Sequence, residues 1–201
     1  MGTEIMLGEP LYITHLIAKQ FEHQQIRYLV GGSLASSLHG IPRATQDVDM
    51  VAELFHKHIS PLVQALKDSF FIDADMIHQA IDHGSSFNLI HLETMFKVDI
   101  FIMQKDLFAR EEMAQRELYH ISETSEQSLY IARAEDIILH KLYWYKTGNE
   151  ISERQWTDAL GVLIVQFDKL DFSYLKKGAR HKNIEKLLAN AIDQAKKKSD
   201  G

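Results

Sequence analysis

Two carboxylates alternate along an apolar stretch, and they are the residues of this chain best suited to chemistry. Asp47 and Asp49 flank Val48, and Met50 follows. Neighbouring side chains of a β-strand point to opposite faces, so both carboxylates share one face while Val48 and Met50 point into a core. Carboxylate oxygens with open positions around them suit hard cations such as Mg²⁺ or Mn²⁺. The spacing therefore predicts a metal pair. The plainer alternative is an ordinary edge strand with two exposed acids.

A glycine pair precedes these acids and ends a short apolar strand expected at residues 27–30. The turn Gly31-Gly32-Ser33 then leads into a short expected helix. Backbone N–H groups at such a turn suit a phosphate, and glycine lets the backbone come close to it. The Ser33 hydroxyl can donate to a phosphate oxygen. A simple strand-to-helix turn with Ser33 as its N-cap would use the same residues, so the turn alone decides nothing.

A third carboxylate, Asp99, lies in an apolar segment that predicts a central strand over residues 96–103, apolar on both faces. An ionised Asp in such a strand is costly unless it is paired or bound to a metal. Beside Asp47 and Asp49 it would complete a two-metal site for phosphoryl transfer, and it could help take a proton from the acceptor hydroxyl. Alternatively, Asp99 is structural and bonds to the turn after the first strand.

These motifs follow one another in a fixed order: Gly31-Gly32-Ser33, then Arg43-x-Thr45-x-Asp47-x-Asp49, then the lone Asp99. The ordered set resembles the polymerase-beta-type nucleotidyltransferase superfamily, over about the first half of the chain. The form of its middle motif is most similar to the minimal prokaryotic branch, which includes abortive-infection-type toxins. The resemblance implies an enzyme that transfers a nucleoside monophosphate from an NTP to a hydroxyl, with Mg²⁺ or Mn²⁺ held by Asp47, Asp49 and Asp99. The acceptor would be a protein, a tRNA 3′ end or a small molecule such as an aminoglycoside.

Further cations are candidates for binding the nucleotide. The resemblance adds Arg43, Thr45 and Lys141 to the phosphate-binding set, although Arg43 could equally pair with a carboxylate or lie on a surface loop. Lys141 and the later Asp158 resemble the helical region that follows the family's core. Asp158 stands four residues after Arg154, so a salt bridge within one helix is the alternative for that pair.

The pattern of the chain is α/β first and helical later. We expect an α/β (α+β) fold in which a mixed β-sheet is flanked by helices and followed by a C-terminal helical region. The predicted division is a catalytic core over residues 1–133 and a helical region over residues 134–201.

Composition fits an enzyme domain of this kind. The chain has 201 residues, of which 45% are hydrophobic, and it has no cysteine, which excludes thiolate metal sites and a cysteine nucleophile. No apolar run is long enough for a membrane span and no signal peptide is evident, so we expect a cytoplasmic protein without a membrane partner. The net charge is −6, yet nine Lys and Arg oppose four Asp and Glu from Lys169 onward. This basic tail could touch RNA, but a solvated helix face is the favoured interpretation.

Other function classes compete with catalysis. The main alternative is a non-catalytic module that binds a nucleotide or a partner protein on the same fold. A ribonuclease would rest only on the basic tail and on the spacing of Arg133 and His140, a short signature that matches by chance often. The scattered histidines do not predict a zinc site. The resemblance also implies a partner protein of the toxin–antitoxin type.

Overall fold

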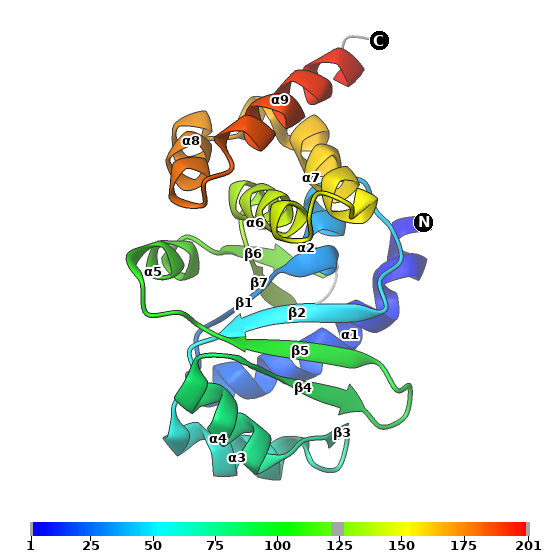
Figure 1. The fold of residues 1–201 in the computed structure, drawn as a ribbon. Coiled ribbons are helices and arrows are strands. Elements are labelled where there is room, and N and C mark those ends of the chain that lie inside the picture. The colour runs from blue at the N-terminus through cyan, green and yellow to red at the C-terminus, as the bar shows by residue number, and fades with distance from the viewer. Residues whose placement is uncertain (1, 122–126, 200–201) are drawn as a thin grey trace. The chain divides into compact units, whose positions relative to one another are not determined.

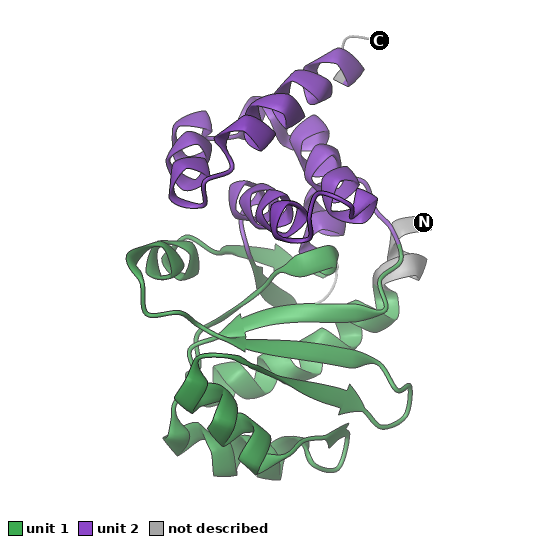
Figure 2. Ribbon diagram, in the orientation of Figure 1, with its two compact units in different colours: residues 1–34, 44–131 green, residues 35–43, 132–201 purple. Residues whose placement is uncertain are grey.

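The computed structural model describes residues 2–121 and 127–199 (Figure 1). The residues cluster into two compact units, coloured separately in Figure 2. Unit 1 comprises residues 1–34 and 44–131, and unit 2 comprises residues 35–43 and 132–201. Segment 35–43 therefore groups with the C-terminal helices, although it lies inside the stretch that we assigned to the core.

Unit 1 is built on a mixed sheet. In the described residues, seven strands run in the order β3-β4-β5-β2-β1-β7-β6. β2 is parallel to β5 and β1 is parallel to β7, while the other neighbours are antiparallel. The strand bounds are β1 (Tyr28–Val30), β2 (Asp47–Ala52), β3 (Phe70–Phe71), β4 (Ser86–His91), β5 (Lys97–Ile102), β6 (Glu117–His120) and β7 (Ser128–Ile131).

Helices flank this sheet. α1 passes behind β2 and β5 in Figure 1 and packs against α3, which in turn packs against α4. α2 follows β1 directly and carries the chain from unit 1 into unit 2. The helices that precede β7 in the chain are α1 (Gly2–His23), α2 (Gly32–His39), η1 (His56–His58), α3 (Ile59–Leu66), α4 (Ala74–His83) and α5 (Leu107–Ala114).

The two parallel strands β2 and β5 each bury one face. Val48 and Met50 on β2 and Val98 and Ile100 on β5 are completely buried, and the residues between them are only half-buried. The expectation that the strand around Asp99 is apolar on both faces is therefore wrong. Only one face of β5 belongs to the core, because the other face of its neighbour β2 carries the two aspartates.

Unit 2 is helical, with α6 (Ala134–Thr147), α7 (Glu153–Gln166), η2 (Phe167–Lys169), α8 (Phe172–His181) and α9 (Glu185–Ser199). Residues 40–41 lie against the middle of α7, where a Cβ on Gly40 would come within 2.7 Å of the Val162 nitrogen. The sheet, its flanking helices and the C-terminal helices confirm the predicted fold class. None of the described helices has the length and apolar character that a membrane span requires.

Candidate active site

Asp47 and Asp49 occupy the half-buried face of β2, as the alternation predicted. The Thr45 hydroxyl donates to the backbone oxygen of Asp47 at 2.8 Å and lies 3.5 Å from its Oδ1. Thr45 therefore fixes the start of the strand beside the first carboxylate. This hydrogen bond is a sufficient reason for a Thr two residues before Asp47, even if Thr45 binds no ligand. The role of Thr45 at a phosphate stays a prediction.

The glycine turn and the second carboxylate are in direct contact. The Gly31 N–H donates to the backbone oxygen of Asp49 at 2.8 Å. Gly32 has φ +56°, and a Cβ built on it would overlap the Asp49 carboxylate, at 2.7 Å from Cγ. Only glycine combines this backbone conformation with this space. The turn thus makes room for Asp49, whether or not its N–H groups also hold a phosphate.

Ser33 lies in the first turn of α2, because the helix begins one residue earlier than expected, at Gly32. The side chain is half-buried and already has an interaction within the chain. Its predicted contact with a phosphate oxygen is not tested by this arrangement.

Asp99 lies directly beside Asp49. The register of β2 and β5 pairs Asp49 with Asp99 and Asp47 with Lys97, so all four side chains share the half-buried face. The Lys97 ammonium lies 2.7 Å from Asp99 Oδ2. This hydrogen bond raises the pKa of Lys97, with help from the charges of Asp47 and Asp49 and against the effect of burial.

Lys97 is the functional candidate that we missed in the sequence. The signal was present, since Lys97 and Asp99 are two residues apart on one strand and must share a face. The strand register that places Lys97 opposite Asp47 could not be predicted from the sequence pattern.

A second charged cluster lies within unit 2. Arg43 makes a bidentate pair with Asp158, with Nε 2.8 Å from Oδ1 and Nη2 2.7 Å from Oδ2. The Lys141 ammonium, on α6, lies 2.8 Å from the same Oδ2, on α7. Burial would raise the pKa of Asp158, but the two cations outweigh it and lower that pKa. Arg43 and Lys141 are thus brought together, and Asp158 pairs with them in place of the Arg154 that we considered.

The sequence and the structure of this chain give different results when they are compared with known proteins. No protein-family profile and no curated protein matches the chain. Among solved structures, an antigenic nucleotidyltransferase-like protein from Paracoccidioides brasiliensis matches with a TM-score of 0.56, at 16% identity, over 91% of each chain. The chain has a nucleotidyltransferase-like fold.

Two structures of the antibiotic-resistance factor ANT(2'')-Ia agree with this assignment. Its complex with adenylyl-2''-tobramycin matches with a TM-score of 0.55 at 11% identity, over 87% of this chain and 97% of that one. Its solution structure matches with a TM-score of 0.53 at 14% identity, over 94% and 100%. At such identities the likeness concerns the nucleotidyltransferase-like fold alone.

The donor chemistry of this fold's carboxylate face fits a hard divalent cation. Asp47, Asp49 and Asp99 offer the oxygen ligands that Mg²⁺ and Mn²⁺ prefer, and the missing Cβ of Gly32 gives the Asp49 carboxylate its place. Within residues 2–121 and 127–199, however, no three Asp, Glu, His or Cys side chains converge as a ready cation cage. The Asp99 carboxylate is turned to the Lys97 ammonium.

Arg133, one half of the considered ribonuclease pair, is engaged within the helical unit. Its Nε lies 3.4 Å from Asp136 Oδ2, and its guanidinium stacks 4.3 Å from the centre of the Tyr174 ring. Tyr174 also donates to Asp136 Oδ1 at 2.6 Å. This cluster gives Arg133 a packing role at the start of α6.

Proposed function

We propose that the protein is a metal-dependent nucleotidyltransferase that moves a nucleoside monophosphate from an NTP to an acceptor hydroxyl. The observation that carries the proposal is the register of β2 and β5, which sets Asp99 beside Asp49 at the glycine turn. A nucleotidyltransferase-like fold surrounds these residues.

The proposed roles follow from the chemistry of each group. Asp47 and Asp49 would hold Mg²⁺ or Mn²⁺, and Asp99 would help to hold a second ion. When bound, the ions neutralise phosphate charge and lower the pKa of an acceptor hydroxyl. The N–H groups of Gly32 and Ser33 would face the phosphates. Gly31, whose N–H already donates to the backbone oxygen of Asp49, would only let the backbone come close to them. Thr45, Arg43 and Lys141 stay predictions as further phosphate contacts, carried by the sequence resemblance.

The proposed transfer is a single displacement at the α-phosphorus of the NTP. The acceptor oxygen forms a bond to the α-phosphorus, and the bond from that phosphorus to the bridging oxygen of pyrophosphate breaks. Pyrophosphate leaves with that electron pair. The hydroxyl proton passes to the Asp99 carboxylate and then to water.

A small hydroxylated molecule is the first acceptor to test. Support comes from ANT(2'')-Ia, whose structure contains an adenylylated tobramycin. A protein hydroxyl and a tRNA 3′ end are the other acceptors that the sequence resemblance implies. A toxin-like role with a partner protein rests on the Arg43-x-Thr45-x-Asp47-x-Asp49 motif alone.

The test is a transfer screen with each α-³²P-labelled NTP against aminoglycosides, tRNA and lysate proteins. We expect Mg²⁺- or Mn²⁺-dependent labelling of one acceptor class together with release of pyrophosphate. Calorimetry of NTP with Mg²⁺ on wild type and on Asp47→Asn accompanies the screen, and metal-dependent binding should weaken in the variant.

Two outcomes would contradict the proposal. Equal metal-dependent NTP binding by wild type and Asp47→Asn would remove the metal pair from the site. NTP binding without pyrophosphate release in any arm of the screen would instead support the non-catalytic binding module.

A further inference from the structure

Lys97 pairs with one of the three carboxylates that are proposed to hold metal. Its ammonium lies 2.7 Å from Asp99 Oδ2, and its backbone position is paired with that of Asp47 across the two parallel strands. Three carboxylates and one ammonium therefore share one face of β2 and β5. Like charges on neighbouring strands repel one another, so the ammonium offsets part of the repulsion between the acids.

We propose that Lys97 is a built-in counter-ion that keeps Asp99 from a divalent cation until its ammonium is displaced. It thereby regulates metal occupancy at the carboxylate face. The inference rests on the proposed function, since it concerns the same three aspartates.

Competition follows from the contact itself. An ammonium at 2.7 Å occupies one of the two Asp99 oxygens, and its charge repels a divalent ion placed close by. The Lys97 side chain is 42% exposed against 22% for Asp99, so its flexible stem can carry the charge out into water. The Asp99 carboxylate cannot move out into water with this ammonium, because Asp99 is fixed in the middle of β5 between β2 and β4.

A nucleotide would shift this balance. The phosphates of an NTP offer the Lys97 ammonium a second anionic partner, which releases Asp99 for the metal. By linkage, a ligand that draws Lys97 away must strengthen metal binding, and the metal must strengthen binding of that ligand by the same factor. The arrangement disfavours metal uptake without nucleotide.

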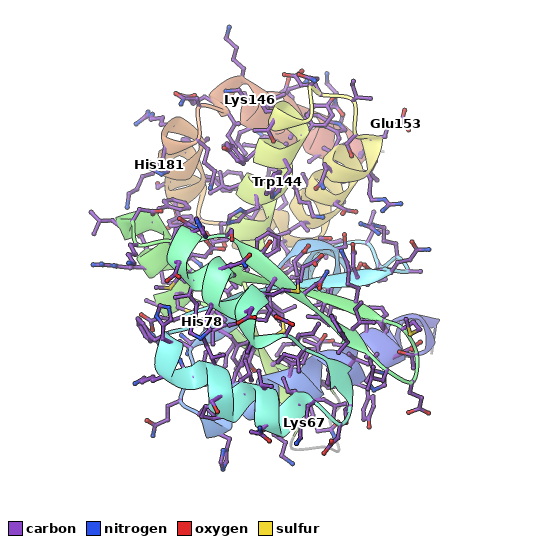
Figure 3. All side chains as sticks on the ribbon, turned by 60° about the horizontal axis from the view of Figure 1, so that its bottom comes forward. Lys67, His78, Trp144, Lys146, Glu153 and His181 are labelled. Atoms are coloured by element: carbon purple, nitrogen blue, oxygen red, sulfur yellow. The ribbon has the colours of Figure 1, made fainter. Side chains whose placement is uncertain are left out.

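The experiment measures Mn²⁺ affinity by electron paramagnetic resonance on the intact chain without nucleotide. Lys97→Met should bind Mn²⁺ at least about tenfold more tightly than wild type, which corresponds to about 1.4 kcal/mol. Lys97→Arg keeps the charge and should bind within about twofold of wild type, a difference of roughly 0.4 kcal/mol. Lys67→Met removes a lysine at the end of α3 (Figure 3) and controls for net charge. If Lys97→Met does not fold, Lys97→Gln replaces it.

The outcomes separate this inference from the proposed function. Equal Mn²⁺ affinity of wild type and Lys97→Met, with weaker binding by Asp49→Asn, overturns the counter-ion role and leaves the metal site standing. Absence of Mn²⁺ binding by every variant, also with a non-hydrolysable NTP analogue, overturns both. A larger Mn²⁺-induced rise in melting temperature for Lys97→Met than for Lys67→Met supports the inference independently.

Discussion

At the scale of single residues, Gly32 joins the glycine turn to the carboxylates. The sequence suggested that this glycine serves a phosphate, but its left-handed backbone and its contact with Asp49 already require it. The proposed phosphate role would therefore be an addition to a structural one. A substitution at this position moves a proposed metal ligand as well as the turn.

We expect Gly32→Ala to lower both stability and metal-dependent NTP binding. Its Cβ must displace the Asp49 carboxylate, and a left-handed backbone costs an L-residue about 1–2 kcal/mol. Gly84→Ala is the matched control, since Gly84 has φ +59° but its Cβ would lie 3.7 Å from the nearest atom. Calorimetry and thermal melting on both variants separate the effects. Equal losses of NTP affinity in the two variants would contradict the link to Asp49.

Asp158 is the second residue whose substitution has a clear expected effect, because its carboxylate neutralises both Arg43 and Lys141. Asp158→Asn leaves both cations without their carboxylate in a largely buried cluster, which should cost about 3 kcal/mol at neutral pH. The exposed Asp168 supplies a control, and Asp168→Asn should change the free energy of unfolding by less than about 0.5 kcal/mol.

The pH dependence of this difference has a definite sign. The pKa of Asp158 is lowered in the folded protein, so its carboxylate stabilises the fold above the ordinary Asp pKa of about 4. That contribution is lost as the pH falls through the lowered pKa. In urea unfolding, the gap between wild type and Asp158→Asn should shrink below about pH 4. A gap that is constant from neutral to acid pH would show that the pair does not stabilise the fold.

At the scale of elements, the register of two parallel strands decides the site. The sequence predicted that Asp47 and Asp49 lie on one face of a strand and Val48 and Met50 on the other, as β2 shows. It could not predict that Asp49 faces Asp99 and that Asp47 faces Lys97, because register depends on the packing of the whole sheet. The polar face of β5 was readable from the alternation of Lys97 and Asp99, but it was missed.

Helical contacts in unit 2 were equally hidden from the sequence. The partners of Asp158 are 115 and 17 positions away in the chain, on a loop and on another helix, whereas the sequence offered a neighbour four residues away. α8 was not predicted, although Asp171 caps it by accepting from the N–H groups of Ser173 and Tyr174. Caps of this kind are the readable signal for such a helix.

The close approach of residues 40–41 to α7 gives a prediction at this scale. Gly40→Ala should destabilise the protein by about 1–3 kcal/mol, because its Cβ would meet backbone atoms of Gly161 and Val162 at 2.8 and 2.7 Å. Gly161→Ala is the reciprocal control, with its nearest contact at 3.3 Å and a gain in helix propensity. Chemical denaturation measures both. A Gly161→Ala variant that loses more than Gly40→Ala would contradict the contact.

At the scale of the whole molecule, the chain has a nucleotidyltransferase-like fold, and the residues proposed for activity are divided between its two units. The three aspartates, the glycine turn and Lys97 belong to unit 1, while Arg43, Lys141 and Asp158 belong to unit 2. The fold-level likeness spans nine-tenths of the chain, so both units take part in it. One fold can host many functions, so the proposed chemistry rests on a few side chains of β2 and β5 and not on the fold.

The central claim is that Asp99 takes part in the transfer step. The most direct measurement is the transfer rate, the NTP affinity and the melting temperature of wild type and Asp99→Asn on the same samples. We predict a loss of at least about 10²-fold in rate with a much smaller change in NTP affinity, as expected for an interaction made chiefly in the transition state. A near-normal rate with a lowered melting temperature would make Asp99 a structural residue and contradict catalysis at this site.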